Sequence, residues 1–154
     1  MLRVLKQIPT ANKKLLFHSC WRSATSQVVE EISLPKSLDA AYLWLCRAQD
    51  ATPDDGVAAW YDLLRGWSAS YPETTGYIIP TFLTYGSVSN DPAATDRAIR
   101  MADWEIAVQL PTGAVRSGIL TAPVGPAVFN TGQVLFGWAA AYQATKESRY
   151  AEAA

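Results

Sequence analysis

Apolar residues along this chain recur at helical spacing in two different patterns. In the first, an apolar stripe faces a polar side, which predicts an amphipathic helix; the two stripes are Leu38, Ala41, Tyr42, Leu45 and Ala48, then Ala98, Ile99, Ala102, Ile106 and Gln109. In the second pattern, over residues 77–85 and 134–142, no residue is charged. A helix that is apolar all round is expected to be buried all round. The sequence therefore predicts an all-α protein in which amphipathic and apolar helices alternate.

This alternation is an internal repeat. The block WLCRAQ begins at position 44 and recurs from position 104 as WEIAVQ. Each block is followed by a turn with a glycine, Gly56 after the first and Gly113 after the second. Thr75 and the next glycine recur as Thr131 and its glycine. The offsets from 75 to 131 and from 44 to 104 give a unit of 56 to 60 residues. An amphipathic helix followed by an apolar one, repeated, is the order that concentric outer and inner rings of helices require.

The charges divide the chain into a basic N-terminal extension, residues 1–36, and a helical-repeat domain, residues 37–154. The extension holds six basic and two acidic residues, and the remainder holds seven basic and twelve acidic residues. It lacks the apolar segment of a secretory signal, and no stretch approaches the roughly 20 apolar residues of a membrane span. We predict a cytoplasmic protein; a transit peptide or a surface-membrane helix are the alternatives for the extension, and membrane contact is not expected.

The C-terminal residues open a third unit. Residues 147–154 match residues 95–102, at the start of the previous amphipathic helix. Repeat arrays bury their faces on neighbouring units and usually end in polar caps. We therefore expect about two and a half helical hairpins, truncated at the C-terminus, with self-association through exposed apolar helices.

Composition excludes several function classes. The formal net charge of −1 gives no field that would attract nucleic acid. Neither a glycine-rich phosphate loop nor a metal-ligand spacing occurs, so no cofactor and no metal are expected. Cys20 and Cys46 lie in different segments without a disulfide pattern. His18 lies beside Cys20 in the extension, where we do not expect the rigid site that a Cys-His nucleophile needs.

The spacing from Trp44 through Gln49 to Gly56, and the run FNTGQ at residues 129–133 before an apolar helix, resemble the α/α-toroid proteins. This superfamily includes six-hairpin glycosidases, uronate epimerases and related polysaccharide-processing proteins. The resemblance covers residues 37–154 and implies a partial α/α toroid. It also implies a functional funnel where the inner helices begin, at residues 70–77 and 129–133. The Trp-to-Gln-to-Gly spacing is also similar to terpenoid cyclases and prenyltransferases, although no acidic cyclase motif is present.

Candidate site residues follow from this funnel. Glu73 is the candidate general acid or base, because glycosyl chemistry and C5 proton abstraction both need a positioned carboxyl group. The alternative is that Ser70 and Glu73 form a capping box, and for Asn130 with Gln133 capping is the favoured interpretation. Aromatic rings that could stack on a sugar, or belong to the core, are Trp60, Tyr61, Trp67, Tyr71 and Tyr77. Asp54 and Asp55 precede a glycine, which favours a turn.

The resulting hypothesis is a carbohydrate-acting protein of polysaccharide metabolism that binds a saccharide or uronate and is inactive as a partial ring. A non-catalytic helical scaffold or glycan-binding protein is the second hypothesis, and a terpenoid-type toroid the third. Two local points stay open. Residues 57–70 fit either a helix or an irregular loop, and Pro80 predicts a late start or a kink in the first apolar helix.

Overall fold

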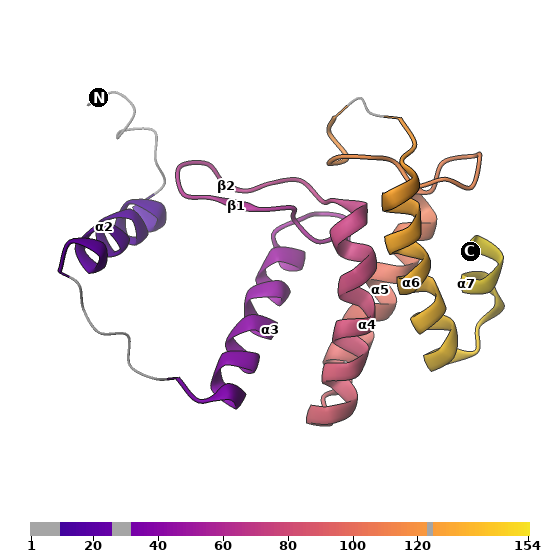
Figure 1. Ribbon diagram of the computed structural model, residues 1–154, viewed down its shortest axis with the longest axis horizontal. Helices are drawn as coiled ribbons and strands as arrows, with labels where there is room; N and C mark the ends of the chain where they lie inside the picture. The colour runs from indigo at the N-terminus through magenta and orange to yellow at the C-terminus, as the bar shows by residue number, and fades with distance from the viewer. Residues whose placement is uncertain (1–9, 26–31, 123–124) are drawn as a thin grey trace.

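The computed structural model describes residues 10–25, 32–122 and 125–154 (Figure 1). This part of the chain is mostly helical, which confirms the all-α class. One short antiparallel hairpin, β1 with β2, pairs Tyr61 with Trp67. Among these residues, no helix has the length and apolar character needed to cross a membrane. The elements are α2 (Thr10–Thr25), α3 (Leu34–Asp50), β1 (Tyr61–Asp62), β2 (Gly66–Trp67), α4 (Pro72–Ser89), α5 (Pro92–Val108), α6 (Val128–Thr145) and α7 (Ser148–Ala153).

Helices α4 and α6 lie side by side and run in the same direction, whereas α3 and α5 run in the opposite direction (Figure 1). Helix α4 packs along both α5 and α6, which contact each other much less. Two glycines allow the close approach of α4 and α6. A Cβ atom on Gly76 would lie 2.7 Å from the Val134 Cα, and one on Gly137 would lie 2.5 Å from the Gly76 carbonyl oxygen. The helix pair is thus set by backbone contact.

The prediction that the two apolar helices are buried all round is wrong. Tyr77 on α4 is 42% exposed, and Phe136 on α6 is 65% exposed. Each helix is covered on the sides that face its neighbours, where the fully buried Ile79 and Trp138 lie. Hydropathy indicates which side chains tolerate burial, but a neighbour must be present to bury them.

The internal repeat is visible in the hydrogen bonds. Gln49 Nε2 donates to the carbonyl oxygens of Asp55 (3.1 Å) and Arg97 (3.3 Å). Gln109 Nε2 donates to the carbonyl oxygens of Gly113 and Ala153, both at 2.8 Å. Each glutamine therefore joins the end of one amphipathic helix to its own turn and to the next amphipathic helix.

The helix ends give the register of the repeat. Helix α4 spans residues 72–89 and α6 spans residues 128–145, so both ends shift by 56. Each of these helices is followed by a residue in the left-handed region, Asn90 or Lys146. Glu147, the N-cap of α7, is then the counterpart of Asp91, the N-cap of α5. The sequence match of residues 147–154 with 95–102 was one helical turn out of register.

Three local predictions are settled by the backbone. Helix α3 begins at Leu34, before the expected position 37, because Pro35 suits the first turn after the N-cap Ser33. Residues 57–70 form neither a helix nor an irregular loop, since they fold into the β1–β2 hairpin. Helix α4 begins at Pro72 and continues through Pro80, so it does not start late.

Candidate functional site

The N-terminal ends of α4 and α6 lie at the same end of the molecule, where the long loops also gather (Figure 1). There the Tyr71 hydroxyl donates to Glu73 Oε2 and accepts a hydrogen bond from Asn130 Nδ2 at 3.3 Å. Asn130 Nδ2 also donates to the carbonyl oxygen of Arg116, at 3.2 Å. Tyr71, Glu73 and Asn130, called the rim network below, come from two repeat units. The sequence predicted all three as site residues.

Both capping interpretations are wrong. The N-cap of α4 is Tyr71, which makes no side-chain capping bond, and the Ser70 hydroxyl donates to Asp54 Oδ1 at 2.5 Å. Asn130 is the third residue of α6, whose N-cap is Ala127. Capping fails because both side chains have other partners: Glu73 accepts from Tyr71, and Asn130 donates to Tyr71 and to the loop before α6.

Two threonines instead fasten the loops to these helices. The Thr75 hydroxyl accepts from the Val57 N–H and donates to the Tyr71 carbonyl oxygen, each at 2.9 Å. Thr131 makes the same pair of bonds in α6, also at 2.9 Å. The loops that shape the rim are therefore anchored in the same way in both units.

The rim network is partly removed from water, because Asn130 is buried and Tyr71 and Glu73 are half-buried. Asn130 is 5% exposed. The pKa of the Tyr71 phenol is raised, first by burial and then by its hydrogen bond to Glu73, although the donors Asn130 and the Gly118 N–H oppose this. Tyr71 is therefore protonated at neutral pH and donates its hydrogen bond to the Glu73 carboxyl group. This hydrogen bond holds the Glu73 carboxyl group in place at the rim.

Beside the rim network lies an aromatic hollow of about 360 Å³ between α3, the hairpin and α4. The rings of Trp44, Tyr61 and Trp67 meet there at centroid distances of 4.8 to 5.7 Å. Trp60, 54% exposed, and Tyr77 also line it. Tyr77 lies one turn beyond Glu73, on the same side of α4. The hollow and the rim network therefore adjoin along α4.

The remaining candidates are placed elsewhere. Gln133 is half-buried in the second turn of α6 and is not part of the rim network. Asp54 and Asp55 serve the turn, since Asp54 accepts from the Gly56 N–H and Asp55 pairs with Arg100. The exposed His18 and Cys20 lie in α2, outside the rim.

Two side chains of the region were not predicted as site residues. Trp44 served only as a landmark of the repeat, whereas Tyr61 was among the aromatic candidates. Arg116 enters because the loop before α6 folds against α4: its Nη2 donates to the Ala122 carbonyl oxygen at 2.8 Å, and its buried Nε has no partner among the described residues. This loop contact cannot be predicted from the spacing of residues in the sequence.

In the described part of the chain, no three histidine, cysteine or acidic side chains lie close enough together to hold a metal ion. Comparisons of the chain with protein-family models, curated proteins and solved structures give no match. A functional assignment therefore depends on the rim network, the aromatic hollow and the sequence resemblance.

Proposed function

We propose that this chain is part of an α/α-toroid protein that binds a saccharide or uronate at the rim and acts on it through Glu73. One observation carries the proposal: the Tyr71 hydroxyl joins Glu73 and Asn130, which come from the starts of two parallel apolar helices. A toroid funnel needs such convergence of residues from successive inner helices. The aromatic hollow beside it offers ring faces of the kind on which sugars stack.

The geometry favours a base role for Glu73. The Tyr71 hydroxyl bonds one Glu73 carboxyl oxygen and so fixes the position of this group, from which it can take a proton, either from carbon or from an attacking water. Tyr71 is a positioning residue, because it holds the carboxylate and is itself held by Asn130. The partial positive charge at the N-terminal ends of α4 and α6 suits a uronate carboxylate better than a neutral sugar.

Binding can be tested by isothermal titration with uronate oligosaccharides and their neutral counterparts. We expect saturable binding that prefers the uronate and that weakens by about tenfold in Tyr71→Phe, the loss of one charge-assisted hydrogen bond. The matched control is Tyr85→Phe, which removes a phenol-to-carboxylate bond of 3.0 Å to Asp39 away from the rim. If neither class of oligosaccharide binds, or if both variants lose the same affinity, the proposal is wrong.

Turnover separates the enzyme from a glycan-binding scaffold. With any oligosaccharide that is processed, Glu73→Gln should lower kcat by at least about a hundredfold, as removal of a general base does. Its KM should change little, because the amide keeps the shape and the hydrogen bond from Tyr71. Binding without turnover in the unchanged protein would select the non-catalytic alternative.

A further inference from the structure

Helix α2 lies beside the β1–β2 hairpin (Figure 1) and is joined to it by a hydrogen bond, in which the Tyr61 hydroxyl donates to Asn12 Oδ1. Asn12 is 4% exposed, and Leu16, one turn further along, is half-buried. Because they are one turn apart, these two residues share one side of α2, the side held against the hairpin. Tyr61 also lines the aromatic hollow, so α2 is attached to a wall of the hollow.

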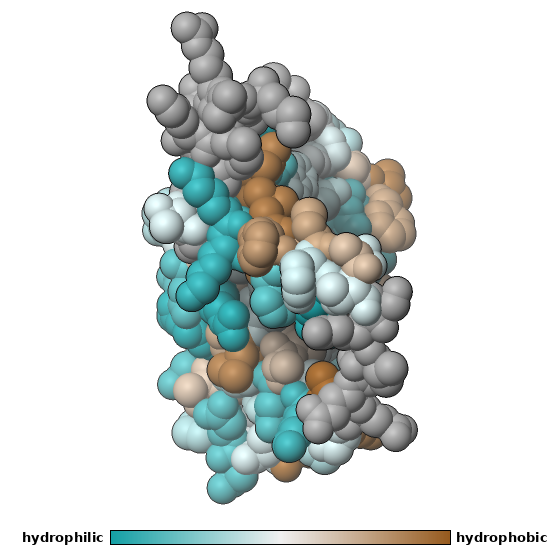
Figure 2. Space-filling model, turned by 90° about the vertical axis from the view of Figure 1, so that its left-hand side faces the viewer, coloured by the Kyte–Doolittle hydropathy of each residue, from teal (hydrophilic) through white to brown (hydrophobic). Residues whose placement is uncertain are grey.

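The other side of α2 combines aromatic rings with basic groups. Phe17 and Trp21 are 72% and 56% exposed, and their rings stack with centroids 6.4 Å apart. Lys14 lies three positions before Phe17 and therefore on the same side. Lys13 and Arg22 are exposed as well, and α2 contains no acidic residue. Figure 2, which views the molecule from the α2 side, shows hydrophobic and hydrophilic residues next to one another on this face. These five residues are called the α2 surface below.

The α2 surface has the chemistry of a binding site for an anionic saccharide. Exposed aromatic rings offer faces on which sugars stack, and lysine and arginine pair with carboxylates. The charge of the chain is divided in the same sense: residues 1–36 hold six basic and two acidic residues, whereas the remainder holds seven basic and twelve acidic residues. A polyanion is therefore attracted to the part of the chain that contains α2 more than to the rest.

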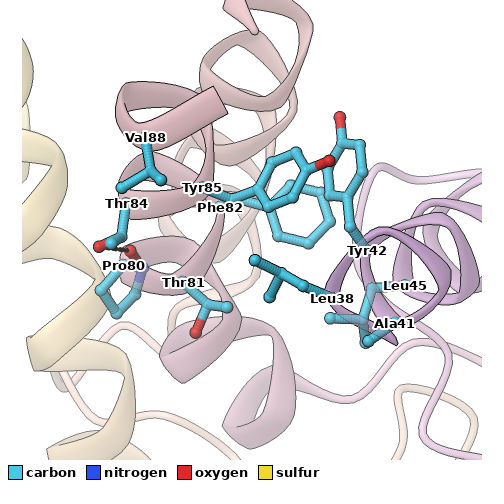
Figure 3. Close-up of a pocket in the computed structure, with 10 residues that line it drawn as sticks. All are labelled: Leu38, Ala41, Tyr42, Leu45, Pro80, Thr81, Phe82, Thr84, Tyr85 and Val88. Atoms are coloured by element: carbon cyan, nitrogen blue, oxygen red, sulfur yellow. Dashed lines mark hydrogen bonds between the residues drawn. The ribbon is translucent and has the colours of Figure 1, made fainter. Parts of the chain in front are cut away.

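Two surfaces adjoin the aromatic hollow, and they differ in charge. One is an apolar groove of about 440 Å³ between α3 and α4 (Figure 3), which shares Leu45 and Thr81 with the hollow. None of the residues that line this groove is charged, so the groove offers no partner for a carboxylate. The other is α2, which is attached to the hollow through Tyr61. A chain of uronates that extends from the hollow is therefore favoured to continue toward α2.

We infer that the saccharide is a polyuronate chain, and that the α2 surface binds the part of it that extends beyond the rim network and the aromatic hollow. The inference rests on the proposed function for the rim and adds a second binding surface for the same ligand. Each uronate that reaches α2 gains a basic partner or a ring on which to stack. Affinity should therefore rise with the length of the chain and fall with added salt, because exposed ion pairs are screened.

Isothermal titration of the whole chain with oligogalacturonates, from the dimer to the dodecamer, tests this inference. We expect the dodecamer to bind at least about tenfold more tightly than the dimer. The double variant Lys13→Gln with Lys14→Gln, and the single variant Trp21→Ala, should each weaken dodecamer binding by about three- to tenfold and leave dimer binding unchanged. Lys146→Gln is the matched control, because Lys146 is an exposed lysine at the end of α6 that is away from the rim. Methyl esterification of the dodecamer should abolish the gain in affinity with length, because it removes the charges.

Circular dichroism establishes that each variant is folded. Absence of dodecamer binding, equal affinities for dimer and dodecamer, or equal losses in Lys146→Gln and the double variant would overturn the inference. Oligoglutamate bound as tightly as the dodecamer would show a general anion site, and phosphatidylserine vesicles bound through Trp21 in preference to the dodecamer would show a membrane site; either result would overturn it too. Dodecamer binding that depends on α2 but is unchanged in Tyr71→Phe would refute the proposed function alone.

Discussion

Glu105 is the buried group from which the sharpest stability prediction follows. It lies on the face of α5 that is packed into the core, is 0% exposed, and neither carboxyl oxygen has a hydrogen-bond partner among the described residues. Burial raises the pKa of this carboxyl well above its ordinary value. The folded protein therefore holds one proton more than the unfolded chain at every pH between the two values. Stability falls there by about 1.4 kcal/mol per pH unit and is highest below the ordinary carboxyl pKa.

Replacement by methionine keeps the length of the side chain and removes both unsatisfied oxygens. We expect Glu105→Met to raise the free energy of unfolding at pH 7 by about 1–3 kcal/mol or more, the cost of leaving a buried polar group unpaired. Urea denaturation between pH 4 and pH 8 measures this. Above the ordinary carboxyl pKa, the difference in free energy of unfolding between Glu105→Met and the unchanged chain should grow by roughly 1.4 kcal/mol per pH unit. The control is Glu152→Met, at an exposed position of α7. If the free energy of unfolding depends on pH in the same way for Glu105→Met and for the unchanged chain, the assigned burial of Glu105 is refuted.

Three further substitutions test the repeat, each by urea denaturation. Thr75→Val and Thr131→Val should each cost about 1–3 kcal/mol, because each leaves a loop N–H without its acceptor; a loss in only one would show that the two anchors are not equivalent. Gly137→Ala should cost about 1–3 kcal/mol through its 2.5 Å approach to a backbone oxygen, and tolerance of alanine would contradict the close helix contact. Gln49→Leu should cost about 1–3 kcal/mol because it removes the amide bonds to the Asp55 and Arg97 carbonyl oxygens, whereas an unchanged midpoint would mean water replaces the amide.

Sequence patterns predicted the helices well because their information is local. The alternation of amphipathic and apolar segments depends on spacing within one helix, and the repeat follows from self-comparison. Thr75 and Thr131 were noticed as part of that repeat, but their role as loop anchors needs the loop and the helix together. The β1–β2 hairpin escaped prediction because each strand has two residues, too few for an alternating pattern.

The candidate site shows the same division between local and distant information. Glu73 and Tyr71 are two positions apart, and the start of an apolar helix marks them. The capping box failed because Asp54, far along the chain, takes the Ser70 hydroxyl. Arg116 could not be found from spacing, since its place depends on how the loop before α6 folds back, with the Leu120 N–H donating to the Ser70 carbonyl oxygen near the start of α4. A local sequence pattern misses side chains whose partners lie in a different segment of the chain.

The bond from Gln49 to the Arg97 carbonyl oxygen has a consequence for the order in which the chain acquires structure. During synthesis, α3 is made well before Arg97 is added to the chain. Until Arg97 has been added, the Gln49 amide lacks one of its native acceptors. The first unit therefore lacks this hydrogen bond even after its own residues have left the ribosome. Gln109 and Ala153 repeat this dependence one unit later. Each unit can therefore complete its native hydrogen bonds only after the next amphipathic helix has been synthesised.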